Sequence, residues 1–397
     1  MGTNSKGGNN GELMPPRRAI GKHEIEMVNE CLDYYQSIGE DTPYHGKYEK
    51  LYCAGFTKYM GGGYTAAVSS GTAAVFVALE ALKLPKGSEV ILPAVIDAGP
   101  LNCIIYQGLV PRLCDTAKRS YNTSLDEIKE RVTDRTKCII AVHCAGDPLE
   151  IDILCNYAKE KGIFVLEDIS QAPGGSYLGK KLGTFGDIAA CSTMYRKSLT
   201  TGSSGGLIYT KDDAIFNNAV AYADRGKPIW DPNYDIRNPG QHLFPALNWN
   251  TNELSCAIGV ASLKRLDETI VTRKNFCREV SEGLKKYSKT MRANNCQFEG
   301  SSPFYLMIDI DMKKLRCSKL IFCQALEQQG IPNNPNYNFL VREWQWCQQH
   351  LKDADKTPNA IEQRDNSFNL FVHEGYSEIE AQKSLQTLIE LEKEYLI

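Results

Sequence analysis

Between about residues 64 and 210, the sequence alternates short apolar runs with segments of helical spacing. The runs are apolar throughout rather than alternating in polarity, which is typical of strands covered on both faces. They span residues 66–69, 89–93, 109–114, 138–143, 163–167, 188–192 and 206–210. Repeated strand–helix–strand units predict a three-layer α/β domain on a seven-stranded, mainly parallel sheet.

Beyond this region the pattern indicates a smaller α+β unit. A long helical pattern (252–287) is followed by a strand (304–311), a helix (318–329) and a last amphipathic helix (377–395). We therefore expect a flexible leader and an N-terminal helix in residues 1–40, a large α/β domain in 41–264 and a small α+β domain in 265–397.

Composition narrows the classes of partner. The 45 basic and 48 acidic side chains nearly balance, and no basic stripe favours nucleic acid. No apolar stretch reaches the length of a membrane span or resembles a signal peptide, so we expect no membrane partner and a cytoplasmic protein. The 14 cysteines and six histidines show no metal-ligand spacing, so the cysteines are expected to be reduced and no metal is expected.

The first apolar run ends in Ser69-Ser70-Gly71-Thr72, where a helix is predicted to begin. Ligands of such sheets gather at the carboxyl ends of the strands. The first N–H groups of a helix attract anions. The amides of Gly71 and Thr72, with the Thr72 hydroxyl, could therefore hold a phosphate. A plain Ser or Thr N-cap is the alternative interpretation.

Two later runs also end in polar residues. Asp168 follows Val165-Leu-Glu, where a carboxylate is costly to bury without a partner, and Gln171 follows three residues later. Asp168 could alternatively cap the next turn. Lys197 lies five residues after Ser192, in the loop that follows another run. A lone lysine is ordinarily a solvated surface residue.

The order of these residues indicates one cofactor. Pyridoxal 5'-phosphate needs an amine for its aldehyde, a carboxylate that keeps its ring nitrogen protonated, and donors for its phosphate. Lys197, Asp168 and the helix start at Gly71 can supply these in turn. Ser192 could add a phosphate contact, and Gln171 could reach the phenolic oxygen of the ring.

With these residues in this order, the chain resembles the DegT/DnrJ/EryC1/StrS sugar aminotransferases, within the fold-type I, aspartate aminotransferase-like superfamily. The resemblance covers most of the chain. The motifs that carry it include Val68-Ser-Ser-Gly-Thr-Ala-Ala, Glu167-Asp-Ile-Ser-Gln-Ala-Pro-Gly, Ser192-Thr-Met-Tyr-Arg-Lys197-Ser-Leu-Thr-Thr-Gly and Leu247-Asn-Trp-Asn-Thr-Asn-Glu-Leu254.

The resemblance implies a homodimer with active sites at the subunit interface. Asn248 matches the family asparagine that reaches the phosphate of the neighbouring subunit's cofactor. The remaining matches are Asp168 at the pyridine nitrogen, Gln171 on the phenolate side, Ser192 at the phosphate and Lys197 at the Schiff-base position. His143 falls within a family strand motif, but a satisfied core histidine is the favoured interpretation.

The chain departs from the family pattern on the substrate side of the cofactor. An ungapped alignment puts Asp97 where the family has an aromatic residue that stacks on the cofactor ring. Either something else covers the ring, or the loop is shifted by a residue. The loop after Lys197 is one residue longer than usual. Because Lys197 is retained, the chain does not match the family dehydratases that carry histidine there.

The resemblance implies an aminotransferase that converts a keto or aldehyde sugar into an amino sugar for surface-polysaccharide or glycoconjugate synthesis. It also implies that the sugar is linked to a nucleotide and that L-glutamate is the amino donor. Asp97 and the altered loop leave a sugar dehydratase, or other carbanion chemistry, as the alternative. A non-catalytic sugar-nucleotide-binding regulator is a more distant one. On composition alone, residues 226–240 and 337–346 are candidate substrate walls.

Overall fold

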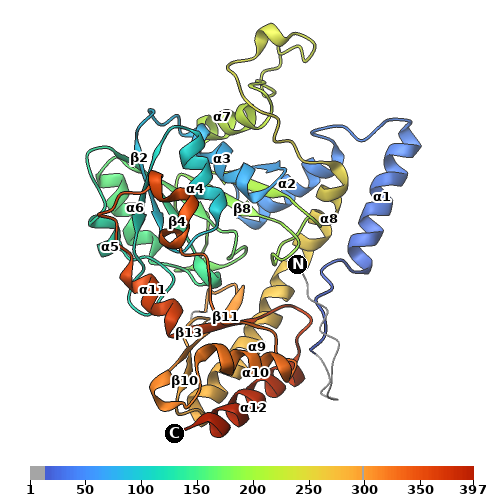
Figure 1. Ribbon diagram of the computed structural model, residues 1–397. Helices are drawn as coiled ribbons and strands as arrows, with labels where there is room; N and C mark the ends of the chain where they lie inside the picture. Colours follow the sequence, from blue (N-terminus) through green and yellow to red (C-terminus); the bar gives the residue numbers. More distant parts are fainter. Residues whose placement is uncertain (1–13, 297–298) are drawn as a thin grey trace.

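The computed structural model describes residues 14–296 and 299–397, and its larger part is built on one seven-stranded sheet (Figure 1). The strand order is β1-β9-β8-β5-β4-β2-β3. β9 runs antiparallel to its two neighbours, and the other adjacent pairs are parallel. The strands are β1 (Tyr64–Val68), β2 (Glu89–Pro93), β3 (Val110–Cys114), β4 (Thr136–Val142), β5 (Phe164–Asp168), β8 (Ile188–Ser192) and β9 (Gly206–Thr210). The predicted mainly parallel sheet is confirmed.

Helices cover both faces of this sheet and complete the three layers. One face packs against α3 (Gly71–Ala81), α4 (Ala98–Tyr106) and α7 (Asp213–Ala223). The other packs against α2 (Lys47–Tyr59), α5 (Leu125–Lys129), α6 (Ile151–Glu160) and α8 (Glu253–Lys264). Successive side chains of one strand enter opposite cores, as Val90 and Ile91 do. Strands buried on both faces explain why the runs are apolar at every position.

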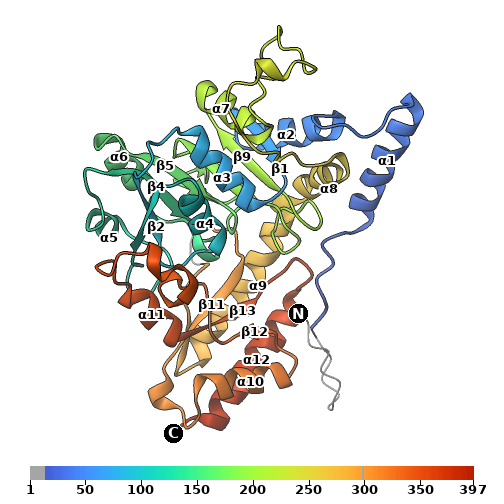
Figure 2. The same ribbon diagram turned by 45° about the horizontal axis from the view of Figure 1, so that its top comes forward.

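A four-stranded antiparallel sheet, in the order β10-β11-β13-β12, organises the C-terminal part of the chain (Figure 2). Its apolar core is shared with three helices and also contains Met14 from the N-terminal segment. The elements are α9 (Leu266–Tyr287), β10 (Met291–Ala293), β11 (Tyr305–Ile310), α10 (Lys319–Gln328), β12 (Asn333–Asn334), β13 (Ser367–Phe371) and α12 (Glu378–Tyr395). The predicted smaller α+β unit is therefore present.

Short elements connect these parts. They are the β6–β7 pair (Ser176–Tyr177 and Lys180–Lys181), α11 (Pro358–Asp365), and the 3-10 turns η1 (Cys144–Gly146), η2 (Pro239–Gln241), η3 (Met312–Lys314), η4 (Val341–Glu343) and η5 (Gln345–His350).

The helical pattern of residues 252–287 is two helices rather than one. α8 ends at Lys264 and α9 begins at Leu266, with Arg265 between them at φ −103° and ψ 7°. The Arg265 guanidinium forms an ion pair with Glu24 of α1 (Lys22–Ile38) at 2.7 Å, and α1 packs against α8. The apolar spacing continues through the break, so periodicity alone missed it. The flexible leader predicted before α1 lies mostly in residues 1–13, outside the described residues.

The two candidate substrate walls lie in different places. Residues 226–240 form a loop that projects outward beyond α7 in both views (Figures 1 and 2). Residues 339–341 instead lie along the segment that follows β2. The Ile96 amide donates to the Phe339 carbonyl at 3.1 Å, and the Val341 amide donates to the Ala94 carbonyl at 3.0 Å.

Candidate active site

Most of the predicted site residues come together at one edge of the large sheet. β1, β2, β5 and β8 run in the same direction, so their carboxyl ends share that edge. Asp168 and Ser192 are the last residues of β5 and β8, and Gly71 opens the helix that follows β1. The positions agree with the rule that ligands of α/β sheets bind beyond the carboxyl ends of the strands.

The start of α3 is open towards this edge. The Ser70 hydroxyl caps the helix by accepting from the Ala73 amide at 3.0 Å. Among the described residues, the amides of Gly71 and Thr72 and the Ser192 hydroxyl donate to no protein acceptor. The N-cap interpretation was therefore correct for Ser70, and it leaves the next two amides free for an anion.

Gly71 and Ser192 touch directly. A Cβ built on Gly71 would lie 2.4 Å from the Ser192 Cβ and 2.8 Å from its hydroxyl oxygen. A side chain at position 71 would therefore fill the space beside the Ser192 hydroxyl. Glycine keeps this corner open and lets the backbone amides approach a ligand.

Asp168 is 7% exposed, and one carboxylate oxygen accepts from the Ser170 amide at 2.9 Å. No basic side chain of the described residues forms an ion pair with it. Burial raises the pKa of Asp168. The hydrogen bonds from Ser170 and the positive charge of Lys197 lower that pKa, but they offset the effect of burial only in part. A bound cation would remove the cost of this buried, unpaired charge.

Lys197 lies half-buried in the loop after β8. Its Nζ is 4.4 Å from the centre of the Phe304 ring. Burial lowers the pKa of Lys197, while the negative charges of Asp168 and Asp97 work in the opposite direction. A lowered pKa increases the fraction of neutral, nucleophilic amine at a given pH.

Gln171 is fixed by hydrogen bonds at both ends of its amide. Its oxygen accepts from the Ala145 amide at 2.7 Å, and its nitrogen donates to the Tyr337 hydroxyl at 3.1 Å. Tyr337 uses one N–H of this amide, and the second N–H could still donate to a cofactor oxygen. That contact stays a prediction. The Tyr337 ring also packs 5.1 Å from that of Tyr305.

Asp97 is an exposed N-cap residue of α4, and its carboxylate accepts from the Gly99 amide at 2.9 Å. A Cβ on Gly99 would lie 2.6 Å from the Thr72 hydroxyl and 3.3 Å from the Asp97 carboxylate. The Asp97 carboxylate therefore lies beside the start of α3, and its charge acts on both Asp168 and Lys197. The position that aligns with the stacking aromatic of the family thus places a carboxylate at the edge of the site.

Two other candidates lie away from this cluster. Asn248 is exposed, and its amide nitrogen is 3.5 Å from the Tyr44 hydroxyl. It is not joined to the residues above within this chain. His143 is fully buried, with Nδ1 accepting from the Leu149 amide at 3.3 Å and Nε2 3.2 Å from the Glu167 carboxylate. The interpretation of His143 as a satisfied core histidine is confirmed.

Sequence reasoning missed two contacts of the site. Phe304, which lies over the Lys197 amine, precedes β11 and belongs to no motif that was recognised. Arg17 donates to the backbone carbonyls of Tyr195 and Lys197 from the N-terminal segment. Both contacts join parts of the chain far apart in sequence. For Tyr337, only the aromatic composition of its segment gave a signal.

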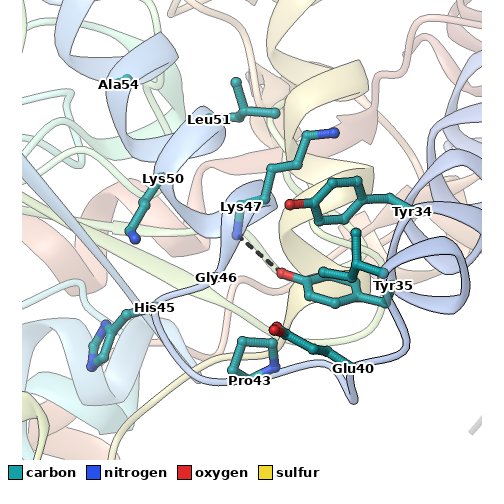
Figure 3. Close-up of a pocket in the computed structure, with 11 residues that line it drawn as sticks. Tyr34, Tyr35, Glu40, Pro43, His45, Gly46, Lys47, Lys50, Leu51 and Ala54 are labelled. Atoms are coloured by element: carbon teal, nitrogen blue, oxygen red, sulfur yellow. Dashed lines mark hydrogen bonds between the residues drawn. The ribbon is translucent and has the colours of Figure 1, made fainter.

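A cavity of about 630 Å³ lies elsewhere, between α1 and α2 (Figure 3). The Lys47 amide donates to the Tyr35 hydroxyl at 3.0 Å across one side of it, and the Lys47 Nζ lies 3.8 Å from the centre of the Tyr34 ring. None of the candidate site residues lines this cavity.

Within residues 14–296 and 299–397, no helix has the length and apolarity to span a membrane, and no three His, Cys, Asp or Glu side chains are grouped to hold a metal ion.

Comparisons with known proteins find relatives in sequence and in fold. A GDP-perosamine synthase of Escherichia coli O157:H7 is 32% identical over 265 residues, which cover 66% of this chain and 68% of that protein. The structure of an aminotransferase from Psychrobacter cryohalolentis is similar with a TM-score of 0.89 at 23% identity, covering 96% of this chain and 99% of that one. An E. coli GDP-4-keto-6-deoxy-D-mannose-3-dehydratase, solved with bound hydrated PLP, has a TM-score of 0.85 at 23% identity, with coverage of 95% and 99%. At these identities, the likeness to the two structures concerns the fold.

The fold matches that of solved aminotransferase structures. The sequence model of the DegT/DnrJ/EryC1/StrS aminotransferase family matches residues 18–388, and the chain belongs to this family of sugar aminotransferases.

Proposed function

We propose that this protein transfers the amino group of L-glutamate to the keto or aldehyde carbon of a nucleotide-linked sugar. The product would be an amino sugar for surface-polysaccharide or glycoconjugate synthesis. Family membership and the similarity to a GDP-perosamine synthase support the substrate class. Retention of Lys197 supports transamination.

The observation that carries the proposal is the meeting of three chemical groups at one sheet edge. They are the Lys197 amine, the buried Asp168 carboxylate and the amides of Gly71 and Thr72, the last two groups having no ion-pair or acceptor partner in the part of the chain that the structure describes. These residues fit pyridoxal phosphate. The absence of a side chain at Gly71 leaves a space beside Ser192 that a Cβ would fill and that a phosphate could enter. Asp168 has no basic partner among the described residues, and a pyridinium N–H would supply one.

Each residue then has a distinct role. Pyridoxal phosphate supplies an electron sink that stabilises negative charge at the carbon losing a proton. Asp168 would accept the ring N–H and keep that nitrogen protonated. The Lys197 Nζ would hold the aldehyde carbon and, once released, move the proton at the α-carbon of the amino acid.

The start of α3 would anchor the phosphate. The amides of Gly71 and Thr72 and the Ser192 hydroxyl are the donors, and Asn248 of a second subunit would add another. The exposure of Asn248 supports this arrangement, because a side chain at the surface is accessible to a neighbouring chain. We accordingly propose a cytoplasmic homodimer whose large domain, residues 41–264, binds the cofactor and whose small domain spans 265–397.

The proposal is tested by two measurements on the purified protein supplied with pyridoxal phosphate. Borohydride reduction followed by peptide mapping should place the label on Lys197 and not on the exposed Lys180. Incubation with L-glutamate and a panel of nucleotide-linked oxo-sugars should release 2-oxoglutarate in equal amount to the amino sugar. A protein that takes up no cofactor would overturn the proposal.

The carboxylate of Asp97 at the edge of the site leaves dehydratase chemistry as an alternative. The ratio of 2-oxoglutarate to amino sugar distinguishes the two reactions. A dehydratase would consume the sugar without forming an equal amount of amino sugar.

A further inference from the structure

We propose that Glu374 is a positioning residue for Lys197, acting through Arg17 on its backbone and through Arg273 on the aromatic ring that lies over its amine. The inference rests on the proposed function, in which Lys197 carries the cofactor. We call Arg17, Arg273 and Glu374 the Glu374 network.

The first arm of the network reaches the Lys197 backbone. The Arg17 Nε lies 3.1 Å and its Nη2 3.0 Å from one carboxylate oxygen of Glu374. The same Nη2 donates to the Lys197 carbonyl at 2.7 Å, and Nη1 donates to the Tyr195 carbonyl. The Arg17 guanidinium therefore binds the Glu374 carboxylate and, at the same time, two backbone carbonyls of the loop that contains Lys197. Only arginine has a planar fork that allows this.

The second arm reaches the backbone beside Phe304, whose ring faces the Lys197 amine. The Arg273 side chain is 1% exposed, and its Nη2 lies 2.8 Å from the other carboxylate oxygen of Glu374. Its Nη1 donates to the Pro303 carbonyl at 3.2 Å. Pro303 precedes Phe304, whose ring centre lies 4.4 Å from the Lys197 Nζ. The second arm therefore fixes the backbone next to the ring that contacts the amine.

Glu374 is the one residue common to both arms. It follows β13, whereas Arg17 precedes α1 and Arg273 lies on α9, so the network joins three distant parts of the chain. Its side chain is 15% exposed and also has the Arg265 Nη1 at 3.8 Å. Without this carboxylate, several guanidinium groups would lie together with little water to separate them. Losing one partner of a buried charge pair costs more than losing an exposed pair.

The decisive variant is Glu374→Gln, which keeps the shape and one acceptor oxygen but turns an N–H₂ group towards an arginine. The matched control is Glu378→Gln, the same change at an exposed glutamate four residues later. Hydrogen exchange of the amides of residues 193–199, measured in the cofactor-free protein, should be faster in Glu374→Gln and unchanged in Glu378→Gln. The dissociation constant of pyridoxal phosphate should rise about tenfold in Glu374→Gln alone, as expected for losing a charge-assisted hydrogen bond.

A second pair of variants keeps the test valid if Glu374→Gln does not fold. Arg17→Met should reproduce the faster exchange and the weaker cofactor binding, and Arg18→Met, at the exposed neighbour, should not. Arg17→Lys should restore cofactor binding only in part, because one ammonium cannot join the carboxylate to two carbonyls. If the network had only a structural role, Glu374→Gln and Arg17→Met would lower the melting temperature but leave exchange at residues 193–199 unchanged. Arg17→Lys would then bind the cofactor as tightly as the unmodified protein. Those results would overturn the inference.

The two proposals fail in different ways. Absence of borohydride label on Lys197 of the unmodified protein would remove the proposed function. Unchanged exchange in Glu374→Gln and Arg17→Met, with label present on Lys197, would remove the role of the Glu374 network alone.

Discussion

Gly71, the first residue of α3, packs so closely on Ser192, the last residue of β8, that a Cβ at position 71 would lie 2.4 Å from that of Ser192. This contact brings two donors of the proposed phosphate site together. Gly71→Ala should therefore displace Ser192 and weaken pyridoxal phosphate binding by about tenfold or more, since overpacking a tight contact costs roughly 1–3 kcal/mol. Equilibrium titration of the cofactor measures the effect. Gly21→Ala is the control, because a Cβ there meets nothing nearer than 3.5 Å; equal loss in both variants would contradict the prediction.

Asp97 should tune the basicity of Lys197. Its negative charge raises the pKa of Lys197 against the larger effect of burial, so Asp97→Asn should lower that pKa further. The rate at which an acylating reagent modifies Lys197 in the cofactor-free protein should then reach its plateau at a lower pH. Mass spectrometry of the Lys197 peptide over a pH series measures this. The exposed Asp126→Asn should leave the profile in place, and a shift of the Asp97→Asn profile to higher pH would contradict the assignment.

Glu374 should contribute to acid stability. Burial raises its pKa, but the charges of Arg273 and Arg17 outweigh this and hold the pKa at about 2, against an ordinary value of 4.5. A carboxyl group whose pKa is lower in the folded state stabilises the fold above its ordinary pKa, and this stabilisation is lost as the pH falls from about 4.5 towards 2. The stabilisation is of the order of 3 kcal/mol.

The free energy of unfolding of Glu374→Gln should therefore depend less on pH between about 5 and 3 than that of the unmodified protein. Urea denaturation at a series of pH values measures the difference. Glu378→Gln serves again as the control. Parallel curves for Glu374→Gln and the unmodified protein would mean that the carboxylate titrates normally.

Asn248 should act on the cofactor of the neighbouring subunit. Asn248→Ala and Lys197→Ala proteins should each be nearly inactive on their own. In a mixed dimer, the Lys197→Ala subunit would still supply Asn248 to the intact lysine of the other subunit, so mixing should restore part of the activity. Co-expression with two affinity tags isolates the mixed dimer. If mixed dimers are as inactive as the parents, Asn248 acts within its own chain or not at the site.

Much of the large domain could be predicted because its signals are local. Strands buried on both faces must be apolar at every position, so all seven runs were recognisable, and 188–192 and 206–210 match β8 and β9 residue for residue. The motifs around Asp168, Ser192 and Lys197 end or follow such runs. Their meeting at one edge then follows from the common direction of the strands.

Other features depend on contacts between distant segments. The break at Arg265 leaves the apolar spacing of α8 and α9 intact, and the ion pair with Glu24 at this break gives no periodic signal. Phe304 and Tyr337 reach the site from the C-terminal part of the chain, and Arg17 from the segment before α1. No spacing in the sequence relates these residues to Lys197.

The alternation of strands and helices, the family, and the residues suited to an aldehyde, a pyridine nitrogen and a phosphate could all be predicted from the sequence, because each depends on short local patterns. The folded structure was needed to find that Asp168 has no basic partner among the described residues, that Gly71 leaves space beside Ser192, and that Glu374 joins Arg17 to Arg273 around Lys197. Those properties depend on burial and on distances between atoms that lie far apart along the chain, and a linear pattern contains neither.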